Sequence, residues 1–167
     1  PNPESHILAA YQSSQGLAVA APTDLKTVQF PYLPTPEHVG EIVARQDIDD
    51  LDIIQVDYKN GARLNLKKTD FKANQIVFNL SFGHGRSELP VNLPGLAEFS
   101  RAVINNSGTG TLRLDDLQRA LTGKNTVLGF DIREDRFQFK GKTVPAETEL
   151  MFQLLYAYLV DPGYREE

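Results

Sequence analysis

The stretch at residues 94–102 reads Pro94-Gly95-Leu96-Ala97-Glu98-Phe99-Ser100-Arg101-Ala102 and contains the beginning of a helix. Leu96, Phe99 and Val103 are spaced i, i+3 and i+7, which places one apolar stripe along that helix. Asn105-Asn106-Ser107-Gly108 follows directly and predicts its end. The remaining elements can be read outward from this helix.

Alternating and helical patterns on both sides of this helix predict an α+β domain. The order is strands, two helices, two strands and a helix, which is typical of helices packed on one face of a mostly antiparallel sheet. The expected strands are 41–45, 54–58, 64–66, 75–82, 128–132 and 137–139, and the expected helices are 96–103, 114–121 and 145–158.

Turn residues mark several boundaries between these elements. Asn60-Gly61 is a strong hairpin signal between the second and third strands. Gly123 is expected to cap the second helix at its C-terminus. Pro145 suits the opening of the last helix, and Asp161-Pro162-Gly163 ends it.

Composition limits the classes of protein to consider. The chain has 167 residues, a formal charge of −5 and 41% apolar residues, which suits one domain with a real core. The acidic balance argues against a general affinity for nucleic acid. No apolar run reaches the roughly 20 residues that span a bilayer. Without cysteine, disulfides and thiolate metal sites are excluded.

Residues 1–39 differ from residues 40–167 and are expected to form a separate arm. This segment holds six of the ten prolines, and its start, Pro1-Asn2-Pro3, suggests a fragment of a longer protein. A short helix is expected around Ile7–Gln12. Residues 16–36 are expected to be an extended strap with an apolar anchor at Phe30–Leu33, lying as a linker on a neighbouring domain.

Five motifs resemble those of the pitrilysin/insulinase-type zinc peptidases, the inverted zincins. The lead Gly95-Leu96-Ala97 is similar to the Gly-Leu-Ala that precedes His-x-x-Glu-His in that family. The other four motifs are in the right order, and the resemblance spans residues 40–165. They are Asn60–Lys67, which resembles the opening hairpin, Gly83–Arg86, which sits where a glycine-rich turn precedes the metal helix, Leu114–Lys124, which resembles a helix closing on Gly-Lys, and Leu150–Arg165, which resembles a helix followed by Pro and Arg.

At the three chemical positions of the motif this sequence has Glu98, Arg101 and Ala102. Zinc there needs two neutral imidazoles and a general-base carboxylate. Glu98 retains the ability to bind a cation, but Arg101 and Ala102 do not. The resemblance therefore implies a degenerate, non-catalytic copy with no metal and no cofactor of its own, and zinc in the catalytic domain of the parent protein.

The resemblance also implies a role and a setting. Such peptidases contain several copies of the domain that close around a polypeptide substrate, so the expected partners are a catalytic domain, in the same or another chain, and that polypeptide. The chain is expected to be a truncated, N-terminal portion of one copy, and a bacterial periplasmic location is expected. Strand 75–82 is a candidate for binding an extended peptide by strand addition if it lies at the edge of the sheet.

Two residues are candidates for substrate binding. Arg101 is expected to hold a substrate carbonyl or carboxylate if it faces the chamber, or otherwise to pair with Glu98 at i, i+3 on the helix surface. His84, between two glycines, is the histidine to test, although an exposed loop position without a role is the simpler interpretation.

Two other sequence patterns do not meet the requirements of a phosphate-binding or calcium-binding site. Ser107–Thr111 lacks the Lys-Ser/Thr of a phosphate-binding loop, and Asp47–Asp52 lacks the turn glycine of a calcium loop. Two alternatives to the peptidase-related role stay open. One is a stand-alone interaction or scaffold module, and the other is a hydrolase that uses Glu98, for which the spacing supplies no second carboxylate.

Overall fold

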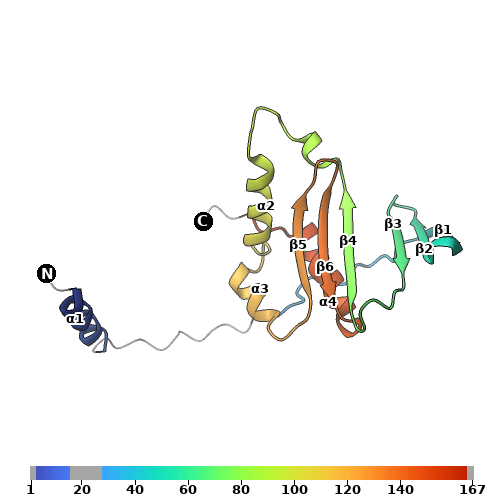
Figure 1. The fold of residues 1–167 in the computed structure, drawn as a ribbon. Coiled ribbons are helices and arrows are strands. Elements are labelled where there is room, and N and C mark those ends of the chain that lie inside the picture. The colour runs from blue at the N-terminus through green and yellow to red at the C-terminus, as the bar shows by residue number, and fades with distance from the viewer. Residues whose placement is uncertain (1–2, 16–27, 165–167) are drawn as a thin grey trace.

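The computed structural model describes residues 3–15 and 28–164, drawn in colour in Figure 1. Short 3-10 turns separate some of the regular elements: η1 (Asp49–Leu51), η2 (Gly85–Glu88) and η3 (Pro145–Glu147). The elements in chain order are α1 (Pro3–Gln15), β1 (Ile42–Ile48), β2 (Ile53–Tyr58), β3 (Arg63–Lys67), β4 (Ile76–Phe82), α2 (Leu96–Asn106), α3 (Leu114–Ala120), β5 (Val127–Ile132), β6 (Phe137–Thr143) and α4 (Thr148–Val160).

The predicted α+β class is confirmed, and its strands divide into two sheets. Strands β1, β2 and β3 form one sheet in that order, and the second sheet has the order β4-β6-β5. Every strand pair in both sheets is antiparallel. The sequence pattern identified the strands, whereas their division into two sheets depends on pairings between distant segments.

The core lies between one face of the second sheet and the helices α2 and α4. Leu80, Phe139 and Phe130 stand side by side across β4, β6 and β5 on that face. Ala97 of α2 and Leu155 of α4 belong to the same buried cluster. In Figure 1, α4 lies behind this sheet and α2 lies on its β5 side. The helices therefore cover one face, as predicted, and leave the other face uncovered.

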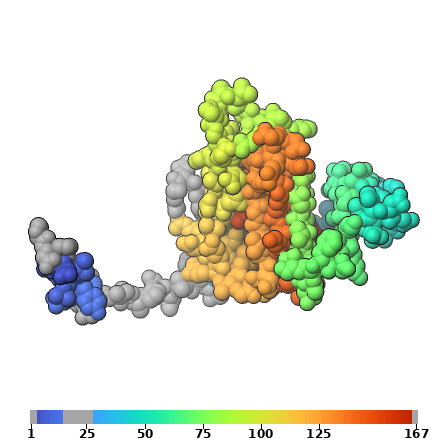
Figure 2. Space-filling model, viewed as in Figure 1, coloured from blue at the N-terminus to red at the C-terminus, as the bar shows by residue number. Residues whose placement is uncertain are grey.

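The first sheet is a small hairpin-based unit with little core of its own. Its β2–β3 turn is the predicted Asn-Gly turn, closed by a 2.8 Å bond from the Tyr58 N–H to the Ala62 carbonyl, with Gly61 at φ +85°. Val56 is the only one of its described apolar residues that is fully buried. Figure 2 shows this sheet as its own lobe on the β4 side of the molecule.

The N-terminal arm is helical at its start and extended where it meets the domain. The predicted short helix is present as α1, and its described side chains are exposed. Residues 28–39 run as a strap past α4, where Phe30, Leu33, Phe152 and Tyr156 help to line an apolar groove of about 310 Å³. The part of the predicted strap at 16–27 lies outside the described residues.

Several predicted boundaries differ from the structure, and two of the differences have a clear reason. The first strand continues beyond Arg45 to Ile48, because it pairs with β2 along its whole length apart from one irregularity near Ile42. The prediction that Gly123 caps the second helix was wrong. That helix ends at Ala120 with Leu121 as its C-cap, and Gly123, at φ +79°, lies in the turn that follows.

Candidate functional site

The two edges of the second sheet differ in what covers them. The sheet order β4-β6-β5 places β4 at one edge and β5 at the other. In Figure 1, α2 stands along the β5 edge, whereas the β4 side has no helix and the first sheet stands there without pairing with β4. An unpaired edge presents a row of N–H and C=O groups to which another extended chain can bond.

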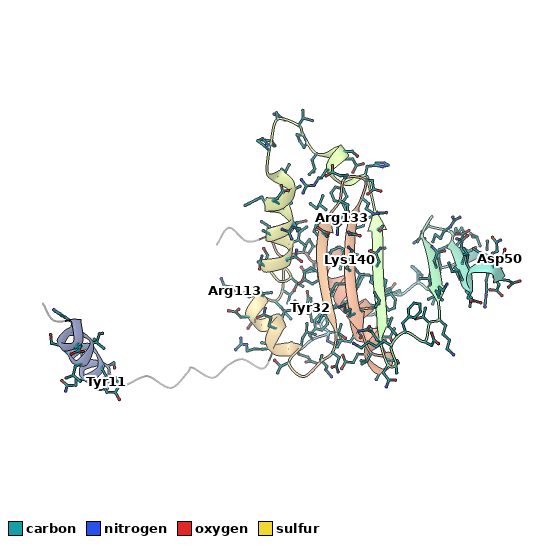
Figure 3. The ribbon with its side chains drawn as sticks, viewed as in Figure 1. Tyr11, Tyr32, Asp50, Arg113, Arg133 and Lys140 are labelled. Atoms are coloured by element: carbon teal, nitrogen blue, oxygen red, sulfur yellow. The ribbon has the colours of Figure 1, made fainter. Side chains whose placement is uncertain are left out.

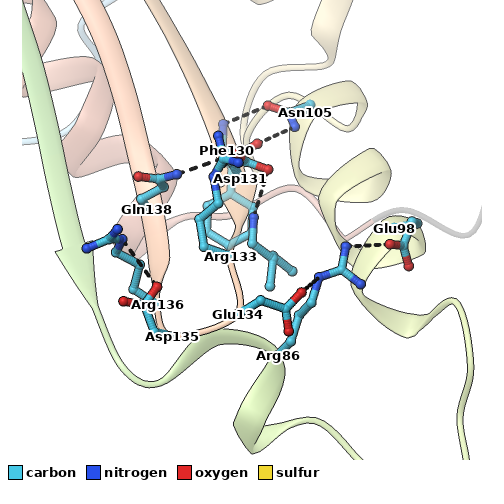
Figure 4. A network of polar contacts seen from close by, with 11 residues as sticks. Arg86, Glu98, Asn105, Phe130, Asp131, Arg133, Glu134, Asp135, Arg136 and Gln138 are labelled. Carbon is cyan, nitrogen blue, oxygen red and sulfur yellow. Dashed lines mark hydrogen bonds and ion pairs between the residues drawn. The ribbon is translucent and has the colours of Figure 1, made fainter.

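Asn105 of α2 seals the β5 edge. Its Oδ1 accepts the Phe130 N–H at 2.8 Å, and its Nδ2 donates to the Phe130 carbonyl at 2.8 Å. The same Nδ2 also donates to the Arg101 carbonyl at 2.8 Å, which holds the amide in place on the helix. Figure 4 shows this side chain reaching from α2 to the strand. The Asn105 amide thus satisfies both main-chain groups of Phe130, as the backbone of a neighbouring strand would.

The pairing register identifies the groups that the β4 edge presents. The N–H and C=O of Phe130 point away from β6, so those of its cross-strand partner Phe139 point away from β5 and toward β4. Phe139 pairs with Leu80, whose N–H and C=O therefore face β6. Alternation then directs the N–H and C=O groups of Val77, Asn79 and Ser81 to the open edge.

Glu98 and Arg101 lie beside η2 near the beginning of α2. Glu98 forms an ion pair with Arg86, not with Arg101, and Arg86 also lies 3.5 Å from Glu134 (Figure 4). The bond from Arg86 lowers the pKa of the Glu98 carboxyl, and Arg101 adds a smaller effect in the same direction. Arg101 is exposed and lines a shallow depression of about 280 Å³ beside Arg133.

His84 lies in an exposed loop whose following residues are fixed to the β5–β6 turn. The Arg86 N–H donates to the Arg133 carbonyl at 2.8 Å. Gly85, at φ +62°, packs so closely there that a Cβ would lie 2.2 Å from that carbonyl oxygen. Among the residues that the structure describes, the ion-pair partner of the His84 ring is Glu88, with 3.7 Å between Nε2 and Oε1. His84 and Arg101 thus flank η2 without contacting each other in any described interaction.

The donor set at Glu98, Arg101 and Ala102 does not fit a zinc ion. Its one carboxylate, Glu98, is engaged by the guanidinium of Arg86, and the neighbouring positions are Arg101 and Ala102. Within residues 3–15 and 28–164 no three His, Cys, Asp or Glu side chains are grouped so that they could hold a metal ion. No reaction step is therefore derived through a metal at these residues.

The uncovered face of the second sheet is basic beside the open edge. Lys140 and Lys142 of β6 are exposed there, and Figure 3 shows Lys140 and Arg133 over the front of the sheet. Gln138, only 3% exposed, lies beneath them. Its amide oxygen, turned toward both cations, accepts from Arg133 Nε at 2.8 Å and Lys140 Nζ at 3.2 Å. Asp131 is the acid of this face and is paired with Arg133 at 2.8 Å.

A separate polar cluster fixes the strap to the domain. The Tyr32 hydroxyl lies 2.7 Å from Asp161 Oδ2 and 2.7 Å from Thr109 Oγ1. The carboxylate can only accept, so the hydroxyl donates to Asp161. Thr109 is fully buried, and its Oγ1 accepts the Leu112 N–H at 3.0 Å. Burial raises the pKa of Tyr32 above its usual 10.0, and the bond to Asp161 adds to this effect.

Comparison with known proteins relates this geometry to a fold. No protein-family model matches the sequence, and no curated protein matches it. A mutant of the ferredoxin protease FusC, solved in complex with Arabidopsis ferredoxin, matches with a TM-score of 0.67 and 21% identity over 98% of this chain. The periplasmic protease PqqL from Escherichia coli matches with a TM-score of 0.67 and 18% identity over 93% of this chain.

These matches show that the chain has a pitrilysin-like fold. The chain spans 18% and 17% of the length of the two proteases, so it corresponds to a small portion of each. The match of 98% reaches beyond residues 40–165, where the sequence motifs lie, and includes part of the N-terminal arm. None of the helices in the described part of the chain is long and apolar enough to cross a membrane.

Sequence reasoning found the open edge but missed the residue that closes the other one. The strand at 75–82 was a candidate for peptide binding on the condition that it lies at an edge, and the sheet order places it at one. Asn105 was interpreted only as part of a helix stop. Its partner Phe130 lies 25 residues away, and no local pattern connects the two.

Proposed function

We propose that this chain is a non-catalytic domain of a zinc metallopeptidase of the pitrilysin type. In this role it forms part of the wall around an enclosed polypeptide and binds that polypeptide in extended form along β4. The pitrilysin-like fold supports the first part of the proposal. One of the similar structures is a protease in complex with a ferredoxin, which is itself a polypeptide.

The open β4 edge is the observation that carries the proposal. Val77, Asn79 and Ser81 direct their main-chain groups outward from this edge, whereas the opposite edge is closed by Asn105. An extended substrate that adds to β4 gains main-chain hydrogen bonds whatever its sequence, which suits a protein that holds unfolded polypeptides.

Catalysis belongs, in this proposal, to another domain. Zinc would be held by a catalytic domain in the same or a partner chain, and Arg101 and His84 would contact substrate near the beginning of α2. A bacterial periplasmic location is part of the proposal, and PqqL is described as periplasmic. A His-x-x-Glu-His motif in the parent gene product or in a partner subunit is expected. A complete genome without one in either place contradicts the peptidase connection.

Proline substitution tests the open edge directly. Asn79→Pro removes an outward N–H and places a ring where the added strand would lie, and proline is tolerated at such edge positions. Asn65 offers a matched control, because Tyr58 bonds to Ala62 across the first hairpin and the N–H of Asn65 is thereby directed to the outer edge of β3.

Binding of a fluorescently labelled unfolded polypeptide to the chain is measured by anisotropy, after circular dichroism has shown that both variants fold. Asn79→Pro is expected to weaken binding at least about tenfold, the loss of roughly 1.4 kcal/mol from two or more hydrogen bonds. Asn65→Pro is expected to bind as the parent chain does. Equal binding by all three proteins, or an equal loss in both variants, contradicts strand addition at β4.

The alternative is a stand-alone interaction module with no peptidase connection. The apolar groove between the strap and α4, lined by Phe30, Leu33, Phe152 and Tyr156, favours this second function because it is a concave apolar surface. Leu33→Ser, a change on the strap side of the groove, separates the two functions. Loss of a specific non-peptidase partner, with polypeptide binding unchanged, would support the module, and loss of neither leaves the groove without a role.

A further inference from the structure

We infer that the open β4 edge selects extended segments that carry acidic side chains at alternate positions, with Lys140 and Lys142 as the residues that determine this preference. The inference rests on the proposed strand addition at β4 and names its substrate class. It depends on the register of the sheet, the charges of its uncovered face and the apolar residues of its other face.

The register places both lysines directly beside the edge strand. Lys140 is the cross-strand partner of Asn79, and Lys142 is the partner of Val77. Side chains two residues apart point to the same face of a sheet, so all four lie on the uncovered face. A strand added to β4 would place every second side chain on this uncovered face. Those side chains would lie opposite Val77 and Asn79, and two strand positions away from Lys140 and Lys142.

The distance is within the combined reach of the side chains. Neighbouring strands lie about 4.8 Å apart, so the added strand would lie about 10 Å from β6. Long side chains interact across more than one strand spacing, and a lysine and a glutamate leaning toward each other close this gap. Val77, Asn79 and Ser81, which stand between them, are small enough to leave the path open.

The charge balance of this face favours an anionic ligand. Among the described residues, no carboxylate forms an ion pair with Lys140 or Lys142, and Asp131 is already paired with Arg133. Gln138 accepts from both Arg133 and Lys140, so two cations lie close together on this face. The whole chain has a net charge of −5, so the excess of positive charge on this face is not a consequence of overall composition.

The other face of the edge favours apolar residues at the intervening positions. Phe82 of β4 is 43% exposed, and Phe152 of α4 is 47% exposed while its ring contacts Phe78 edge to face. Side chains of the added strand that point to the helix side would cover these rings. The preferred segment therefore alternates apolar residues with Asp or Glu, and two of its acids are spaced i and i+2 to match Lys140 and Lys142.

The experiment compares three short peptides that share apolar residues at odd positions and carry Glu, Gln or Lys at two central even positions. Binding to the full chain is measured by anisotropy. The charge-reversal variant Lys140→Glu/Lys142→Glu is compared with Lys67→Glu/Lys68→Glu, which changes the net charge equally at the end of β3 and in the residue that follows it. Asn79→Pro reports whether each peptide binds at the edge at all.

The parent chain is expected to bind the Glu peptide roughly fivefold more tightly than the Gln peptide, as two exposed ion pairs supply, and the Lys peptide least tightly. Lys140→Glu/Lys142→Glu should reverse this order, and Lys67→Glu/Lys68→Glu should preserve it. Equal binding of all three peptides, still lost in Asn79→Pro, overturns the acidic preference and leaves strand addition standing. No binding by any peptide overturns both.

A second copy of the chain is the competing occupant, because the β1–β2 turn carries Asp49, Asp50 and Asp52 at the far end of the first sheet (Figure 3). Sedimentation of the parent chain and of Lys140→Glu/Lys142→Glu decides this point. A monomer in both supports an external acidic segment. A dimer that the lysine reversal dissociates overturns the inference in favour of self-association.

Discussion

The two edges of the β4-β6-β5 sheet differ in whether their outward main-chain groups have hydrogen-bond partners. At β5 a helix side chain, Asn105, occupies the main-chain groups of Phe130, whereas at β4 the groups of Val77, Asn79 and Ser81 face outward. Exposed edges promote aggregation, and proteins commonly cover or charge them. The difference indicates that the fold can close an edge and leaves β4 open, which is the basis of the proposed peptide binding.

The largest expected effect on stability is at Gly85, which packs η2 against the β5–β6 turn and so holds the end of β4 in place. Gly85→Ala would place a Cβ 2.2 Å from the Arg133 carbonyl oxygen at a φ of +62°. The combined strain and overpacking should lower the free energy of unfolding by about 3–5 kcal/mol. Gly95→Ala, at φ +85° with open space around it, isolates the backbone cost and should lose only about 1 kcal/mol.

Urea denaturation measures both glycine variants. Losses of equal size in Gly85→Ala and Gly95→Ala would show that η2 is not held tightly against the β5–β6 turn. The end of β4 would then not be fixed relative to β5, and the comparison of the two edges would rest on a movable element.

Removing the Asn105 amide, which bonds the main chain of the β5 edge, should have the next largest effect on stability. Asn105→Ala leaves the N–H and C=O of Phe130 without their partner, which should lower the free energy of unfolding by about 2 kcal/mol. The exposed edge should also promote self-association in sedimentation experiments. Asn106 is the control, because its Nδ2 donates only to the Ala102 carbonyl within the helix, at 2.7 Å. Asn106→Ala should change stability by less than about 0.5 kcal/mol.

If Asn105→Ala is as stable and as monomeric as Asn106→Ala, the amide does not seal the edge. The β5 edge would then be no better protected than the β4 edge, despite its hydrogen bonds to Asn105.

A smaller effect is expected at the strap, away from both edges. Tyr32→Phe removes the hydroxyl that donates to Asp161 and should cost about 1 kcal/mol at neutral pH. Burial raises the pKa of Tyr32, so the folded state favours the neutral phenol. Its contribution is therefore complete below pH 10.0 and is lost as the pH rises through the higher folded-state pKa.

Thermal unfolding across the alkaline range checks this prediction, with Tyr11→Phe in the exposed helix α1 as the control. The gap in stability between parent and Tyr32→Phe should narrow above pH 10.0, whereas Tyr11→Phe should follow the parent throughout. Polypeptide binding at β4 should be unchanged in Tyr32→Phe. A loss of binding in this variant would mean that the open edge depends on the strap.

Local patterns predicted the elements of this fold, and contacts between distant residues account for most of what they missed. The alternation of Phe130 and Ile132 with polar residues, followed by Phe137 and Phe139, was sufficient to predict the β5–β6 hairpin and its buried face. These residues are close in sequence and their period is two. The division into two sheets has no such local signal.

The candidate site was predicted only in part for the same reason. Glu98 was expected to pair with Arg101 one turn away, but it pairs with Arg86, which is brought to it by the docking of η2 on the β5–β6 turn. The motif comparison identified the positions that lack zinc ligands. The basic face at Lys140 becomes visible only when the register shows which strand it adjoins.

Hydrogen exchange of individual amides, followed by NMR with and without the acidic alternating peptide, tests the central claim most directly. The open edge predicts that the N–H groups of Val77, Asn79 and Ser81 exchange rapidly in the free chain and become protected when the peptide is added. The Phe130 N–H, already bonded to Asn105, should be protected in both states. Protection that appears elsewhere, with these three amides unchanged, would contradict the account.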